Sequence, residues 1–202
     1  LMEFCGGHTV SIFKHGIRQL LPSTIEMLSG PGCPVCVTDN ADLDKAIALA
    51  RLPNVIITTF GDMFRVPGTQ ISLADAKTDG ADIRMVYSVV DAVNIARRNP
   101  EREVVHAAVG FETTAPTTAA ELLRGVPENF SLLVCHRLIP PAMEFLLASG
   151  EVALDGFICP GHVSTIIGSK PYEPLSSKYG VPQVIAGFEP IDVLLGVWML
   201  LK

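Results

Sequence analysis

Aromatic residues are scarce in this sequence: they make up 6% of its 202 residues, and Trp198 is the single tryptophan. Proteins that bind nucleic acid strands without sequence preference stack the bases on aromatic side chains. They also place cations against the phosphates, whereas this chain has a formal net charge of -6. We therefore expect no nucleic acid partner.

The long hydrophobic runs of membrane proteins are also missing. No apolar stretch reaches the roughly 18 residues that a membrane-spanning helix needs. The first residues show no charged region followed by a hydrophobic core and a cleavage site. There is no GxxxxGK[ST] loop either, so no motif points to a nucleotide. These absences favour a cytoplasmic protein without a membrane partner.

Cysteines are few and odd in number. Five cysteines at these spacings are not typical of a secreted scaffold held together by disulfide bonds. We expect them to be reduced thiols, metal ligands or redox-active groups.

Apolar residues, in contrast, are abundant, at 49% of the chain, with a mean hydropathy of +0.39. Short β-rich runs alternate with helical patterns from one end to the other. The predicted strands are LMEFC (1–5), TIEML (24–28), NVIITTF (54–60), DIRMVYS (82–88), EVVHAAVG (103–110), FSLLVCH (130–136), DGFICPG (155–161) and PQVIAG (182–187). Nearly continuous apolar strands that alternate with helices predict an α/β fold with parallel sheets.

Eight strand–helix units in this length favour two open sheets of about four strands each over a closed barrel, which takes about 250 residues. The polar connection VVDAVNIARRNPERE favours a boundary near residue 88, with one domain over 1–88 and a second over 89–202. The chain opens at Leu1 and stops in a helix-like pattern, WMLLK, so we expect it to be part of a longer protein.

The unusual residues follow the predicted strands. They lie in CGGHT (5–9), GPGCPVC (30–36), TFGDMFRVPG (59–68), GFETTAP (110–116), CPGHVS (159–164) and GFEP (187–190). In open α/β sheets, ligands bind outside the carboxyl ends of the strands. Glycine and proline at these places are equally explained as strand-to-helix turns. Turns alone do not explain the neighbouring cysteines and histidines, so we expect a functional site at this edge.

Cys33 and Cys36 form a CxxC pair with two open interpretations. At the start of a helix, the helix dipole would lower the pKa of Cys33 and make the pair a redox couple. Alternatively the pair is half of a zinc site, which Cys5 and His8 would complete as a Cys3His set.

Three further residues are candidates at the strand ends. His8 is a metal ligand, a base for Cys5 or the start of a helix, and His162 is a second candidate ligand or proton carrier. Glu112 in GFETT either orients a histidine or caps a helix. Cys135 and Cys159 are expected to be buried small apolar residues, and His106 a core residue of its strand.

CGGHT, GPGCPVCVT, TFGDMFRVPG, GFETTAPTTA and PGHVSTIIG, in this order and at these intervals, resemble the HypD family of hydrogenase maturation proteins along essentially all 202 residues. Each motif alone is a weak signal, but five in series are highly specific. The resemblance implies a fold of two similar α/β domains across a cleft.

The resemblance also implies a function as a scaffold on which the iron–dicyanide–carbonyl centre of nickel–iron hydrogenases is assembled. Cys5 would bind the iron together with a cysteine of a small HypC-type chaperone, and a HypE-type protein would donate the cyanides. Cys33 and Cys36 would be the redox dithiol. His8 would lie at the metal with Cys5, and Gly6, Gly7, Glu112 and His162 would surround the iron unit.

Two departures from the family pattern accompany the resemblance. Val10 stands where family members carry a second histidine, and the family's C-terminal region, which holds a four-iron four-sulfur cluster, lies beyond this chain. A general thiol–disulfide oxidoreductase and a zinc-stabilised interaction module remain alternative functions.

Overall fold

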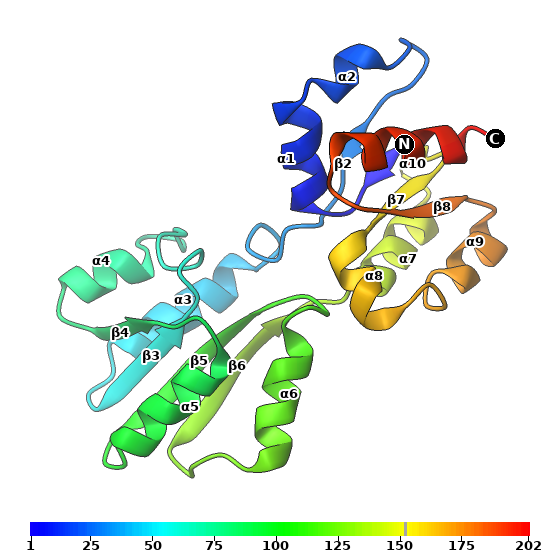
Figure 1. Cartoon of the computed structure of the whole chain (residues 1–202). Helices are drawn as coiled ribbons and strands as arrows, with labels where there is room; N and C mark the ends of the chain where they lie inside the picture. The colour runs from blue at the N-terminus through cyan, green and yellow to red at the C-terminus, as the bar shows by residue number, and fades with distance from the viewer. Residues whose placement is uncertain (152) are drawn as a thin grey trace. The chain divides into compact units, whose positions relative to one another are not determined.

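The computed structural model describes residues 1–151 and 153–202, and it confirms the α/β fold class. A strand overlaps each of the eight predicted ranges, although the one predicted over 24–28 begins only at Leu28, and all eight strands pair in parallel. The strands are β1 (Met2–Glu3), β2 (Leu28–Ser29), β3 (Val55–Thr59), β4 (Asp82–Met85), β5 (Glu103–Gly110), β6 (Phe130–His136), β7 (Phe157–Pro160) and β8 (Gln183–Ala186). The helices are α1 (Gly6–Lys14), α2 (Ile17–Leu20), α3 (Asn40–Ala50), α4 (Leu73–Thr78), α5 (Val89–Arg98), α6 (Ala115–Arg124), α7 (Ile139–Ser149), α8 (Gly161–Ile167), α9 (Glu173–Tyr179) and α10 (Pro190–Leu200) (Figure 1).

The strands form two separate four-stranded sheets, each in its own compact unit. The first unit comprises Leu1–Cys33 and Leu138–Lys202 and holds the sheet β2-β1-β7-β8. The second unit is the continuous segment Pro34–Arg137 and holds the sheet β4-β3-β5-β6.

This division differs from the boundary that the sequence indicated near residue 88. The chain leaves the first sheet after β2, builds the whole second unit, and returns so that Met2 of β1 pairs with Phe157 of β7. Pairing between strands so distant in sequence leaves no mark on the composition of a connecting segment. A polar linker therefore could not locate the boundary.

The two sheets share one strand order. In each, the first strand in sequence is flanked by the second strand on one side and by the third on the other, with the fourth strand outside the third. The chain thus adds its second strand on one side of the first and its third strand on the other side. The order of the strands therefore reverses between β1 and β7 in the first sheet and between β3 and β5 in the second. Such a reversal is the switch point at which open α/β sheets bind ligands.

Apolar side chains fix the helices on the sheets. In the second unit, α3 and α4 pack on the face that carries Ile57 and Ile83, and α5 packs on the face that carries Ile56 and Val104 (Figure 1). In the first unit, α1, α2 and α10 share a buried cluster with β7 and β8. Because both faces are covered, the strand ends are the places where the loops meet solvent.

None of the helices among residues 1–151 and 153–202 combines the length and the apolar character that a membrane crossing requires.

Candidate functional site

Cys5 lies at the switch point of the first sheet. It follows β1 after one intervening residue, Phe4, and is the N-cap residue of α1, while α8 begins with Gly161 and His162 directly after the neighbouring strand β7. The strand-end position that the sequence predicted for Cys5, Gly6, Gly7 and His8 is therefore found in the structure.

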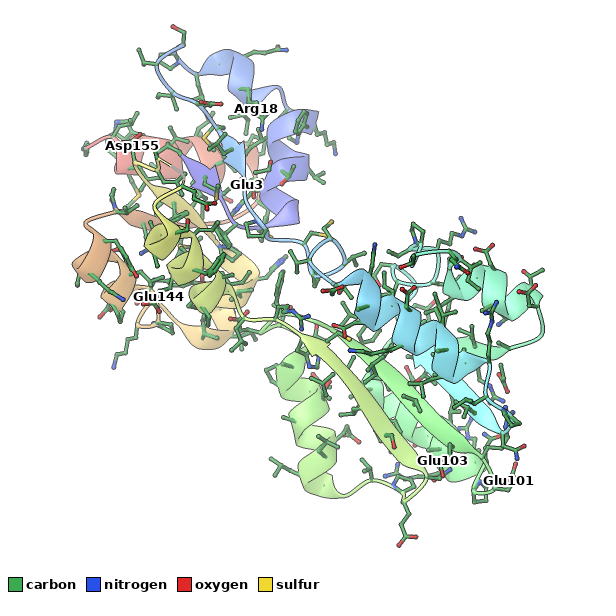
Figure 2. The ribbon with its side chains drawn as sticks, turned by 180° about the vertical axis from the view of Figure 1, so that it is seen from behind. Glu3, Arg18, Glu101, Glu103, Glu144 and Asp155 are labelled. Carbon is green, nitrogen blue, oxygen red and sulfur yellow. The ribbon has the colours of Figure 1, made fainter. Side chains whose placement is uncertain are left out.

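A buried carboxylate, which the sequence analysis did not identify, holds the main chain at this point. Glu3 is 1% exposed and ends β1 (Figure 2). Its Oε2 accepts a hydrogen bond from the Cys5 N–H at 2.9 Å, and its Oε1 accepts the hydroxyl of Thr9. The sequence did contain a signal for this role, namely a single acidic residue in an otherwise apolar strand. A buried charge is costly unless hydrogen bonds compensate it, so such a residue is expected to have hydrogen-bond partners.

The surroundings of the Cys5 sulfur favour the protonated thiol. Burial, as the main cause, raises the pKa of Cys5, and the negative charge of Glu3 adds to this effect. Hydrogen bonds from the backbone N–H groups of Gly7 and His8 act in the opposite direction. A metal cation that binds the sulfur displaces the proton and stabilises the thiolate. Cys5 is therefore suited to remain a thiol until a cation binds.

The glycines of GPGC bring Cys33 next to Cys5. A Cβ on Gly32 would overlap the backbone of Phe4 and Cys5, so only glycine permits this approach. The Gly32 carbonyl accepts a hydrogen bond from the Gly6 N–H at 3.2 Å, and a Cβ on Gly6 would lie 3.9 Å from the Cβ of Cys33. Cys33 in turn raises the pKa of Cys5, although burial contributes more.

The CxxC pair occupies a turn and not the first turn of a helix. Residues 34–37 form this turn, Thr38 closes it by donating its hydroxyl to the Pro34 carbonyl at 2.8 Å, and α3 starts only at Asn40. Asp39 caps α3 by accepting a hydrogen bond from the Ala41 N–H. A helix dipole acts on the first turn alone. The expectation that it activates Cys33 is therefore wrong, because the turn separates the pair from α3.

His8 is fully buried and acts as a hydrogen-bond donor. Its Nε2 lies 2.9 Å from the Gly187 carbonyl oxygen and 3.2 Å from that of Ala186. Carbonyl oxygens only accept, so this nitrogen carries the proton. Burial lowers the pKa of His8, which keeps the ring neutral. Its Nδ1 has no hydrogen-bond partner among the described residues, so only this atom remains for a metal or a proton.

Phe188 lies between two histidines in this unit. The Phe188 ring centroid lies 4.7 Å from that of His8 and 4.3 Å from that of His162, which is exposed at the start of α8. A Cβ on Gly7 would lie 2.8 Å from the Phe188 ring, so this glycine makes room for the aromatic side chain. Both histidines therefore contact Phe188 of the GFEP loop, a link that the sequence did not reveal, and only His162 of the two is exposed.

Cys36 and Glu112 belong to the second unit. Cys36 is exposed, whereas the Glu112 side chain is 6% exposed where the chain leaves β5. Cys135 and Cys159 are buried, and burial raises the pKa of Cys159 to about 12, so both fit the predicted role of small apolar core residues. His106 is also buried, as predicted.

The described residues contain no group of three or more histidine, cysteine, aspartate or glutamate side chains arranged to hold a metal ion. The Cys3His zinc set of Cys5, His8, Cys33 and Cys36 is thus not assembled in this structure. The His8 Nε2 is instead hydrogen-bonded to main-chain carbonyls.

Comparison with known proteins gives one consistent result. The family model described as HypD, hydrogenase formation hypA family, matches residues 1–202. A putative hydrogenase expression/formation protein of Methanocaldococcus jannaschii is 53% identical over 205 residues, which cover 100% of this chain and 57% of that protein. The hydrogenase maturation factors HypD of Rhodobacter capsulatus and Escherichia coli are 51% and 47% identical, again over 100% of this chain and over 54% and 55% of their own lengths. The chain therefore spans little more than half the length of these relatives.

Proposed function

Because the chain belongs to the HypD family of hydrogenase formation proteins, we propose that it functions in hydrogenase maturation, as the part of a HypD protein on which the iron centre is assembled. The observation that carries this proposal is the position of Cys5. Its thiol lies at a switch point, beside a main chain that Glu3, Gly6 and Gly32 fix.

In this proposal, Cys5 binds the incoming iron as a thiolate. The iron is the cargo of the protein, and a soft sulfur ligand suits iron that carries cyanide and carbonyl groups. Two histidines, His8 and His162, and the two glycines after Cys5 surround the iron unit, with Glu112 as a further candidate. The backbone N–H groups of Gly7 and His8 stabilise the thiolate, since they already face the sulfur.

Cys33 and Cys36 act as the dithiol of the assembly reaction. Oxidation of the pair to a disulfide releases two electrons and two protons, which an assembly step can use. The proximity of Cys33 to Cys5 supports this role, because it brings one sulfur of the pair to the iron ligand.

A HypC-type chaperone and a HypE-type cyanide donor are the partners that the proposal requires. The chaperone contributes the second cysteine ligand of the iron, and the donor supplies the cyanide groups. A four-iron four-sulfur cluster belongs to the region that family members carry beyond the segment matched here.

Infrared spectroscopy tests the proposal. The chain is co-produced with a HypC-type chaperone and the cyanide-donating proteins, purified, and examined for cyanide and carbonyl bands. We expect bands in the unmodified chain and in Cys159→Ala, which removes a buried thiol of the same unit, and none in Cys5→Ala. Thermal unfolding of Cys5→Ala should match that of the unmodified chain. Bands that persist in Cys5→Ala, or are missing from the unmodified chain, would contradict the proposal.

A further inference from the structure

Strand β8 forms a free edge of the first sheet. It pairs with β7 on one side and, within the described chain, has no strand on the other. The Phe157 N–H donates to the Pro182 carbonyl at 3.0 Å, which sets the phase of the ladder between β7 and β8. Every second residue of a paired strand directs its main-chain groups toward the partner. Gln183 and Ile185 therefore direct theirs away from β7, toward the free edge.

The outward main-chain groups of β8 are available for pairing. Within residues 1–151 and 153–202, the N–H and C=O groups of Gln183 and Ile185 have no hydrogen-bond partner. Edge strands are usually protected from pairing by charged side chains, prolines or bulges. The four residues of β8, QVIA, include neither a charged residue nor a proline. The edge can therefore accept another strand.

A groove of about 570 Å³ follows this edge. Its lining includes Val184 and Ile185, whose side chains point to opposite faces of the sheet because neighbouring strand residues alternate. Val184 belongs to the buried cluster that includes α10, whereas the Gln183 amide on the other face donates to Ser176 Oγ of α9 at 3.1 Å (Figure 1). Ser176 and Met199 of α10 both line the groove. Only a groove that passes along the strand edge reaches both faces.

The two walls of the groove differ in chemistry. The wall on the side of α9 is polar and includes Ser169, Glu173, Ser176 and Ser177. Glu173 is exposed and is the only charged residue of the lining in the described chain, where it forms no ion pair. On the side of α10, the exposed Met199 side chain forms an apolar wall. The groove therefore suits a segment with a cationic side chain on one face and apolar side chains on the other.

We propose that this edge binds an extended segment of a partner protein, which adds to the four-stranded sheet beside β8. Its main chain pairs with the N–H and C=O groups of Gln183 and Ile185. Its side chains alternate, with lysine or arginine toward Glu173 and apolar residues toward Met199. In strand addition of this kind, main-chain hydrogen bonds provide affinity and the alternating side chains provide specificity. This inference does not rest on iron assembly at Cys5.

An NMR titration of the isotope-labelled 202-residue chain tests the site. The probe is a synthetic heptapeptide in which valine and lysine alternate between terminal threonines, so that an extended conformation separates the two side-chain types. We expect the amide signals of Gln183 and Ile185 to shift with a Kd below about 1 mM. Solvent exchange of the Ile185 N–H should slow when the peptide binds. The same peptide with glutamate in place of lysine should bind at least about fivefold more weakly.

Two variants separate the main-chain and side-chain contributions. Ile185→Pro removes the outward N–H and spares the hydrogen bonds to β7, so it should weaken binding about tenfold. Ile185→Val keeps this N–H and should leave the Kd unchanged. Glu173→Gln removes the charge at an exposed position and should weaken binding about threefold. Glu26→Gln, at an exposed position before β2, is the matched control and should have no effect.

Four results would overturn the proposal. The first is the absence of shifts at Gln183 and Ile185 with about 10 mM peptide. The second is equal affinity for the lysine and glutamate peptides. The third is an unchanged Kd in Ile185→Pro or, if that variant fails to fold, in Glu173→Gln. The fourth is a shift of the same signals with protein concentration alone, because a second copy of the chain would then occupy the edge.

Discussion

Glu3 connects the strand β1 to the chemistry of Cys5 through one carboxylate. It accepts the Cys5 N–H and the Thr9 hydroxyl, and its charge raises the pKa of the neighbouring thiol, an effect second to that of burial. The residue thus both positions the sulfur and disfavours a bare thiolate. With a metal cation bound at Cys5, the negative charge of Glu3 would no longer disfavour the thiolate, because the carboxylate attracts the cation.

Replacing Glu3 by glutamine should make Cys5 more reactive. The neutral amide keeps the size of the side chain and removes the negative charge, so the pKa of Cys5 should fall and the thiolate fraction at pH 7.5 should rise. We expect alkylation of Cys5 by iodoacetamide to be about threefold faster, because the thiolate is the form that reacts. Mass spectrometry of the Cys5 peptide measures the rate.

Glu103→Gln is the control for this experiment. Glu103 is an exposed glutamate of the second unit (Figure 2), so its replacement should leave the Cys5 rate unchanged. Thermal unfolding of both variants checks that faster alkylation does not come from unfolding. An unchanged or slower rate in Glu3→Gln would show that the carboxylate does not control the thiol.

At the scale of elements, His8 joins α1 to the end of β8. The hydrogen bonds from its Nε2 to Ala186 and Gly187 cross between segments almost 180 residues apart in sequence. The GFEP loop after β8 then places Phe188 between His8 and His162. His8 is therefore part of the packed interior, whereas His162 is exposed at the surface.

This difference predicts unequal stability effects. His8→Ala leaves two main-chain carbonyls without their donor and removes a buried ring, so it should lower the free energy of unfolding by about 3 kcal/mol. His162→Ala removes an exposed ring and should cost less than about 1 kcal/mol. Urea denaturation of both variants measures the two values. Equal losses would mean that His8 has no special role in joining α1 to β8.

The sequence predicted the strands of both sheets and the strand-end position of Cys5, because apolar periodicity and glycine placement are local signals. It did not predict the partners of His8, because those carbonyls lie on β8 and its loop. The sequence GFE occurs twice, in GFETT and in GFEP, but this repeat does not mark equivalent positions in the two sheets. One copy follows the third strand of the second sheet and the other follows the fourth strand of the first, so they are not equivalent.

The whole molecule is built from two units with one topology, the second inserted between β2 and α7 of the first. Only long-range strand pairing reveals this insertion, which is why composition placed the boundary elsewhere. Because the two sheets share one strand order, each unit has its own switch point. In the first unit that edge carries thiols and imidazoles, and in the second it carries threonine hydroxyls and aromatic rings.

The pH dependence of folding should reflect histidines that are buried in a neutral form. His106 is fully buried in β5, with its Nδ1 3.1 Å from the Thr58 hydroxyl oxygen, and burial lowers its pKa to about 4. In the unfolded chain, histidine has a pKa of about 6.5. Between these values the unfolded chain binds the proton more readily. The stability that this group contributes is therefore complete above pH 6.5 and is lost as the pH falls toward 4.

For His106 alone, we expect the free energy of unfolding to decrease by about 2 kcal/mol between pH 7 and pH 5. Urea denaturation at the two pH values measures the decrease. His106→Gln cannot take up a proton and should lose this part of the pH dependence, whereas His15→Gln, at an exposed position after α1, should retain it. The same dependence in both variants would mean that other groups cause it. His8, whose pKa burial also lowers, is the next group to test, because its protonation would place a charge in a buried position, which the hydrogen bonds to the Ala186 and Gly187 carbonyls offset only in part.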